Sequence, residues 1–110
     1  MERQIARSVR ELPSLVDLIH DEWFDIADIR IDTRAHEVTI PFCSTPRRLV
    51  VRRARELQLD DTEGVDRYDL NTVTYERERE QIIIHTGVPL HLVVLVEGLE
   101  VVVECSSPAL

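Results

Sequence analysis

The spacing of apolar residues changes near residue 23, which predicts a helical segment followed by strands. In the first 22 residues, apolar side chains recur every three or four positions, as they do on one face of a helix. These residues are Ile5, Val9, Leu12, Val16 and Ile19. Pro13 interrupts the stripe, because proline lacks a backbone donor and clashes with the preceding turn. We therefore expect either a kink or two helices, with Ser14 as the cap of the second.

From Trp23 onward, apolar and polar residues alternate, which is the period of a strand with one buried face. Residues 26–32 and 37–43 are predicted to pair as a hairpin with Asp32 opposite Glu37. This register gives three apolar pairs on the inner face and places Arg30 opposite Thr39 on the outer face. The apolar pairs are Ile31 with Val38, Ile29 with Ile40, and Ala27 with Phe42. A slip of one residue would destroy this match.

Two further segments of the predicted sheet need separate treatment. Pro41 cannot donate to a neighbouring strand, so its strand should lie at a sheet edge there. Residues 48–59 fit a strand, with Leu49, Val51, Leu57 and Leu59 on one face, or a helix that starts after Thr45-Pro46. We interpret them as strand, because the acidic, glycine-containing segment 60–66 resembles a hairpin loop.

The last forty residues predict a four-stranded meander with turns at Glu78-Arg79, at 86–90 and at Glu97-Gly98. The three turns are placed independently, yet they produce one wholly apolar face, a consistency that supports the register. The pairs on this face include Tyr75 with Ile82, Val73 with Ile84, Ile82 with Val94, and Val94 with Val101. The opposite face mixes polar and apolar residues, so we expect the N-terminal helix or a second subunit to cover part of it.

These elements predict an α+β fold in a single domain, residues 1–110. An N-terminal helical segment (residues 1–22) packs on a mostly antiparallel β-meander of about six to eight strands (residues 23–110). A globular chain of 110 residues should have a radius of gyration of about 13 Å and bury one core. Trp23 and Phe24, at the junction of the two parts, are expected to lie in that core.

The charge of the chain is unevenly divided. The net charge is −8, and residues 56–110 carry three arginines against twelve acids. An acidic surface repels phosphate backbones, so general nucleic-acid binding is disfavoured. One basic cluster interrupts this pattern, with no acid inside it: Arg47, Arg48, Arg52, Arg53 and Arg55. It could face an anion or an acidic partner, but we favour an internal charge match to the acids that follow at Glu56, Asp60, Asp61, Glu63 and Asp66.

Two constellations suggest metal ligands. The predicted register places His85, His91 and Glu104 in a row across three strands, and two imidazoles with a carboxylate suit zinc or ferrous iron. The alternative is an exposed polar end of a hairpin, since a flat sheet spaces side chains in a line. Asp17, His20 and Asp21 share one face of the predicted helix. Bundle metal sites need such a motif from two helices, so here a solvated face is favoured.

Several kinds of catalytic machinery are absent from the sequence. All 13 basic residues are arginine, which excludes a lysine Schiff base and a GK[ST] nucleotide loop. There is no G-x-S-x-G elbow, and neither Cys43 nor Cys105 has a histidine close in sequence. The two cysteines have no metal-ligand spacing and are expected to be reduced and unbridged. We expect neither catalysis nor a cofactor.

The sequence also lacks a membrane signal. No apolar run reaches about 18 residues, and the charged N-terminus is unlike a signal peptide, so we expect a cytoplasmic protein without membrane contact. An acidic domain without cofactors suits fast electrostatic association with a basic protein, as in inhibitors of the immunity or antitoxin kind. The expected function is therefore a non-catalytic protein-binding module. The alternatives are a metal-binding protein that uses the two-histidine row and a structural homo-oligomer.

Overall fold

Two antiparallel sheets dominate the computed structural model, which describes residues 2–61 and 63–105. The first, sheet A, has the order β1-β10-β5-β4-β3. Its strands are β1 (Glu2–Ala6), β10 (Val101–Cys105), β5 (Arg47–Val51), β4 (Glu37–Pro41) and β3 (Arg30–Asp32). The second, sheet B, has the order β2-β7-β8-β9-β6. Its strands are β2 (Trp23–Asp25), β7 (Arg67–Glu76), β8 (Gln81–Thr86), β9 (His91–Val96) and β6 (Ala54–Asp60).

The fold agrees with the α+β prediction only broadly. Antiparallel strands and one short helix are present, but the ten strands exceed the predicted six to eight and form two sheets rather than one meander. The inner faces of both sheets contribute to one hydrophobic core. Phe24 lies in this core, with its ring 6.5 Å from Phe42 and 6.4 Å from Tyr68. The radius of gyration is 13.0 Å, as expected from the length.

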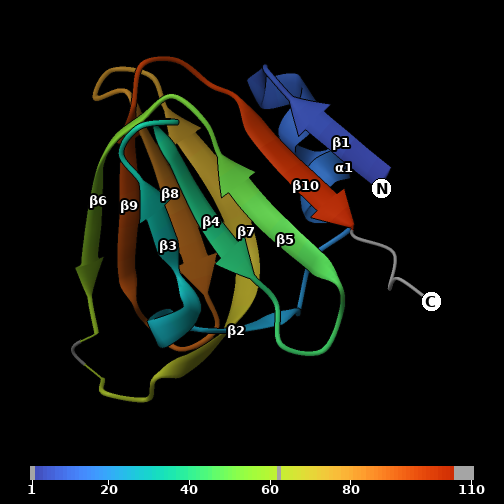
Figure 1. Ribbon diagram of the computed structural model, residues 1–110, viewed down its shortest axis with the longest axis vertical. Coiled ribbons are helices and arrows are strands. Elements are labelled where there is room, and N and C mark those ends of the chain that lie inside the picture. The colour runs from blue at the N-terminus through green and yellow to red at the C-terminus, as the bar shows by residue number, and fades with distance from the viewer. Residues whose placement is uncertain (1, 62, 106–110) are drawn as a thin grey trace.

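The N-terminal segment is less helical than its apolar spacing predicted. It begins with β1, and helical structure is limited to the short 3-10 helix η1 (Val9–Glu11) and to α1 (Leu12–Val16). Pro13 neither kinks nor breaks a helix, because it lies in the first turn of α1, where its missing N–H needs no partner. Ser14 lies inside α1 and does not cap it. The helix contacts β1 and β7, at one side of the two sheets (Figure 1).

The hairpins between strands that follow each other closely are largely as predicted. β3 and β4 pair with Ile31 opposite Val38 and Asp32 opposite Glu37. The predicted pairs of Ile29 with Ile40 and of Ala27 with Phe42 are not part of the ladder, which begins at Arg30, because residues Ile26–Asp28 make a second 3-10 helix, η2. The β3–β4 ladder ends at Thr39, so Pro41 lies at an edge, as predicted.

The registers of β7, β8 and β9 are also confirmed. Val73 lies opposite Ile84 and Tyr75 opposite Ile82, while Ile82 also lies opposite Val94. The three strands therefore form the meander that the sequence predicted, with one apolar face toward the core.

The predicted third turn, at Glu97-Gly98, is wrong. β9 belongs to sheet B and β10 to sheet A, so residues 97–100 cross from one sheet to the other. Residues 52–53 make the opposite crossing between β5 and β6. The two crossings are joined by bonds from Arg52 N to Glu100 O (2.9 Å) and from Glu97 N to Arg53 O (2.9 Å). Residues 47–60 and 91–105 thus form one bent ribbon, with positive φ at Arg53 (57°) and Gly98 (116°).

The segment 60–66 is likewise not a hairpin loop. The prediction of strand for residues 48–59 is supported, since β5 and β6 fall within or next to this range. However, β6 pairs with β9, and β7 lies on the far side of β8. The chain therefore crosses the end of sheet B between β6 and β7.

Candidate functional site

The predicted metal row is not formed. His85 and His91 belong to sheet B, whereas Glu104 lies on β10 in sheet A. Glu104 is buried and accepts hydrogen bonds from Arg48 through Nη2 (2.8 Å) and Nε (3.2 Å). His85 instead has its Nε2 at 2.9 Å from Thr74 Oγ1. Within residues 2–61 and 63–105, no group of three or more histidine, cysteine, aspartate or glutamate side chains is arranged to hold a metal ion.

The second metal candidate is dispersed because the helix ends early. α1 ends at Val16, so Asp17, His20 and Asp21 lie in turns and share no helical face. The His20 ring reaches across to β7, where its Nδ1 lies 2.8 Å from the carbonyl oxygen of Asn71. Its Nε2 lies 3.5 Å from Asp21 Oδ1. His20 therefore joins the end of the helical segment to the edge of sheet B.

The arginine cluster mainly makes internal contacts, but not with the acids that the sequence suggested. Arg47 donates to the carbonyl oxygen of Leu18 (2.7 Å), and Arg48 pairs with Glu104. Arg52 pairs with Glu100 (2.9 Å) and with Glu37 (3.4 Å). The partners thus come from strands adjacent in space and not from the acidic segment that follows in sequence.

Two rows of opposite charges result on the outer face of sheet A. One row joins Arg3, Glu104 and Arg48, and the other joins Arg7, Glu100, Arg52 and Glu37. The hydrogen bond from Arg52 lowers the pKa of Glu100, and the same bond raises the pKa of Arg52. The rows flank Val50 and Val102, which are buried although they face away from the core. This arrangement is structural, because each guanidinium of the rows is already paired.

Only two members of the arginine cluster keep exposed side chains without a carboxylate partner among the described residues. Arg53 makes one long contact to the carbonyl oxygen of Glu97 (3.4 Å). Arg55 lies at a β-bulge of β6. Both line a hollow between the crossings, together with His36, but Glu37, Glu97 and Glu100 line the same hollow. The mixture of charges favours neither an anion nor a cation there.

The cysteines are unbridged, as expected. Cys43 is exposed and Cys105 is half-buried, and both are free thiols. Cys105 lies at the end of β10, between Glu2 of β1 and Arg47 of β5.

A different site emerges where four segments meet at the lower end of the molecule in Figure 1. β2 pairs with the start of β7, Trp23 O accepts from Cys43 N (2.8 Å), and Asp66 O accepts from Ile26 N (2.9 Å). Gly87, in the β8–β9 connection, donates to the Asp69 carboxylate (3.1 Å). Any side chain at Gly87 would place its Cβ 2.5 Å from that carboxylate. These bonds fix four separate segments in one surface.

This surface, which we call the acidic end, carries seven carboxylates. They are Asp25, Asp28, Asp60, Asp61, Glu63, Asp66 and Asp69. In the described part of the chain, the only ion pair that involves any of them joins Asp25 to Arg67 (3.8 Å). Asp61 is engaged by the Tyr68 hydroxyl and the backbone of Gly64. Most of the negative charge of this end is therefore not neutralised within the described chain.

Exposed apolar side chains gather at the same end. Six large apolar residues are exposed among the described ones, and four of them lie here: Trp23 (45%), Val65 (48%), Leu59 (39%) and Val88 (36%). Trp23 was expected in the core, which is wrong. β2 turns Phe24 inward and Trp23 outward, because neighbouring residues of a strand face opposite sides. The acidic run 60–66 was visible in the sequence, but its meeting with Trp23 and Val88 depends on long-range pairing.

The comparisons with other proteins add no assignment. No family model matches the chain, and no curated protein or solved structure matches it. Among the described residues, no helix combines the length and hydropathy that a membrane crossing requires.

Proposed function

We propose that this protein is a non-catalytic binding module that captures a basic partner protein through the acidic end, in the manner of an immunity-type or antitoxin-like inhibitor in a reducing cytoplasm. The observation that carries the proposal is the coincidence of seven carboxylates and four exposed apolar side chains at one end of the molecule. Each feature alone is common on protein surfaces. Together they match the two requirements of a fast and specific protein interface.

The carboxylates supply attraction at a distance. Opposite charges on two surfaces steer encounter and raise association rates, most strongly at low salt. The net charge of −8 and the near absence of basic partners at the acidic end give this surface a negative potential. A partner with a basic face is therefore the expected ligand.

The apolar side chains supply contact energy once the surfaces meet. Tryptophan is enriched among the few residues that dominate interface energetics, and such residues are surrounded by polar groups that exclude water. Trp23 is held on a paired strand, so little conformational entropy is lost when it is buried. Val65 and Val88 are exposed next to Asp66 and Gly87, whose backbones bond to Ile26 and Asp69.

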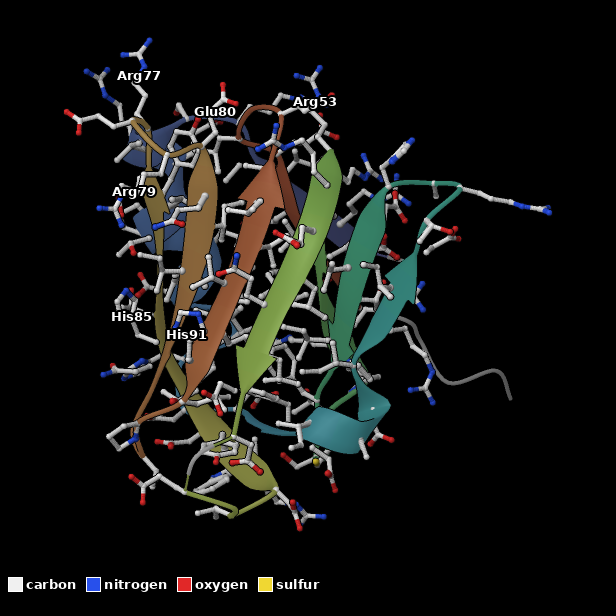
Figure 2. All side chains as sticks on the ribbon, turned by 90° about the vertical axis from the view of Figure 1, so that its left-hand side faces the viewer. Arg53, Arg77, Arg79, Glu80, His85 and His91 are labelled. Atoms are coloured by element: carbon white, nitrogen blue, oxygen red, sulfur yellow. The ribbon has the colours of Figure 1, made fainter. Side chains whose placement is uncertain are left out.

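The test is affinity capture from extracts of the source organism, performed with matched variants. We expect a basic protein to be retained at an ionic strength of about 0.05 M and released at about 0.5 M, where charges are screened over a few ångströms. The triple variant Asp60→Asn, Glu63→Gln, Asp66→Asn should lose the partner. The control variant Glu78→Gln, Glu80→Gln, Glu97→Gln removes the same charge from exposed positions and should retain the partner. Glu80 lies at the opposite end of the molecule (Figure 2), Glu78 is in the same turn, and Glu97 follows Val96, which donates to Glu80 O.

The apolar part is tested separately. Trp23→Ala should weaken capture at least tenfold, which corresponds to about 1.4 kcal/mol. Ile31→Ala, at an exposed position on β3, should not. Equal capture by both triple variants would contradict the proposal. Capture of only a second copy of the chain would contradict it as well and would support self-association.

A further inference from the structure

The outer edge of β7 is only partly occupied. β2 pairs with β7 at Arg67–Asp69, and Leu70 extends the pairing through its N–H to Glu22 O (2.8 Å) and its carbonyl to Asp21 N (2.8 Å). β7 continues to Glu76, but no strand among the described residues pairs with this edge beyond Leu70. The helical segment lies beside the open part instead (Figure 1).

The open edge presents backbone groups at every second residue. The Asn71 carbonyl points away from β8, toward the His20 ring. Because the backbone groups of successive strand residues point to opposite edges, Val73 and Tyr75 present theirs on this same side. No hydrogen bond joins the backbone of either residue to the helical segment in the part of the chain that the structure describes. Such an edge is a template for one more strand.

A groove of about 640 Å³ separates this edge from the helical segment. Its wall is apolar and includes Leu12, Pro13 and Val16, with Val9 at its rim and 61% exposed. A strand added to β7 would turn one face toward this wall and the other toward solvent. Alternating apolar and polar residues would match that environment.

The two ends of the groove carry opposite charges. Asp17 lines it near Asn71, and Asp21 is bonded to the Leu70 carbonyl at the same end. At the Tyr75 end a smaller hollow continues the groove, and Arg77 lines it together with Arg7, which also pairs with Glu100. An extended ligand would therefore place a basic group at the first end and an acidic group at the second.

We propose that this groove binds an extended segment of a protein partner as an additional antiparallel strand, in line with β2. β7 runs from Asn71 toward Tyr75, so an antiparallel segment enters beside Arg77 and leaves beside Asp17. The segment has an acidic residue first, apolar residues at alternate positions facing the helical wall, and a basic residue last. The main-chain bonds supply affinity, and the side-chain pattern and terminal charges supply specificity. The proposal goes beyond the function assigned to the acidic end and uses none of its residues.

The experiment uses the full chain and blocked heptapeptides, with binding followed by fluorescence polarisation. The probe acetyl-Glu-Val-Thr-Val-Thr-Val-Arg-amide should bind, and its charge-exchanged form, with Arg first and Glu last, should bind at least threefold more weakly. Arg77→Glu should reduce or reverse this preference. Equal affinity for the two peptides in the unaltered chain would overturn the assigned direction.

Backbone pairing is tested with two N-methylated versions of the probe, each altered at one alternate set of residues. Only one set faces β7, so exactly one version should lose binding while the other keeps it. Equal binding by both would overturn strand addition. Val9→Asp should abolish binding, whereas Val65→Asp, an exposed valine outside the groove, should not. Thermal melts of both variants establish that they are folded, and unchanged binding by folded Val9→Asp would also overturn the proposal.

Discussion

The outer faces of the two sheets are held together in different ways. On sheet A, the polar contacts join segments far apart in the chain: Arg48 to Glu104 across 56 positions and Arg52 to Glu100 across 48. On sheet B, the contacts join neighbours within hairpins, such as Thr74 to His85 across 11 positions. Sheet B therefore contains a locally determined meander, whereas sheet A requires distant parts of the chain to meet.

The two outer faces also differ in the exposure of apolar residues that point away from the core. The charge rows of sheet A cover Val50 and Val102, whose exposed fractions are 3% and 0%. On sheet B, Val93 also faces outward and is buried (4%), whereas Ile83 and Leu95 face outward and remain half-buried. On sheet A, the paired arginine and glutamate side chains cover apolar residues, because their aliphatic parts lie over apolar surface while their charged groups stay in water.

The largest loss of stability is expected from a change on the inner faces of the two sheets, which share one core. Val94 is fully buried between Ile82 and Leu57. Val94→Asp would bury an unpaired carboxylate and should lower the free energy of unfolding by about 4 kcal/mol or more. Glu78→Ala, at an exposed turn, should change it by less than about 0.5 kcal/mol. Urea unfolding measures both, and equal midpoints would show that the β8–β9 register is wrong.

A smaller loss of stability is expected from a change in the charge rows on the outer face of sheet A. Glu104→Gln leaves the guanidinium of Arg48 without its carboxylate and should lower the free energy of unfolding by about 1–3 kcal/mol. The double variant Arg48→Met, Glu104→Met removes both charges and should recover most of this loss. Glu104 is buried and Arg48 is partly exposed, and an apolar pair often replaces a buried charge and its partner without cost. A double variant no more stable than Glu104→Gln would contradict the interpretation that these side chains stabilise the sheet mainly by covering apolar residues.

The pH dependence of the free energy of unfolding provides a second test of the charge rows on sheet A. The bond from Arg52 lowers the pKa of Glu100, so its contribution is present above pH 4.5 and is lost as the pH falls through its lower folded-state pKa. Glu100→Gln should therefore reduce the loss of stability between about pH 5 and about pH 2. Urea midpoints across this range provide the measurement. An unchanged acid limb in the variant would show that Arg52 and Glu100 do not set it.

The smallest loss of stability is expected from a change on the outer face of sheet B. Thr74 and His85 form an exposed contact, so Thr74→Val should change the free energy of unfolding by no more than about 0.5 kcal/mol. Valine also suits a strand as well as threonine does. A loss as large as that of Glu104→Gln would erase the proposed difference between the two faces.

The sequence predicts local pairing well and long-range pairing poorly. The β3–β4 and β7–β8 registers followed from short connections, because a short turn leaves few ways to align two alternating strands. The link from Val96 to Val101 looks equally short, yet it passes between sheets. Alternation shows which residues face the core, but both sheets share that core, so it does not show to which sheet a strand belongs.

The site was predictable only in its composition. The acidic residues 60–66 could be read directly, whereas the exposure of Trp23 depends on its pairing with Asp69. The arginine cluster was expected to match the acids that follow it in sequence, which is wrong. Arg48 and Arg52 pair instead with Glu104 and Glu100, on the bent ribbon that the sequence did not reveal. The metal row of His85, His91 and Glu104 failed for the same reason.

The pairing of β1 with β10 has a consequence for the order in which the chain folds during synthesis. Ala6 pairs with Val101, and β1 has no other strand partner among the described residues. At about 5–20 residues per second, a ribosome needs several seconds or more to deliver β10 after β1. We therefore expect β7–β9 to be protected from proteolysis in a released chain that ends at residue 100, while β1 remains cleavable. Protection of β1 at that length would show that it finds another partner first.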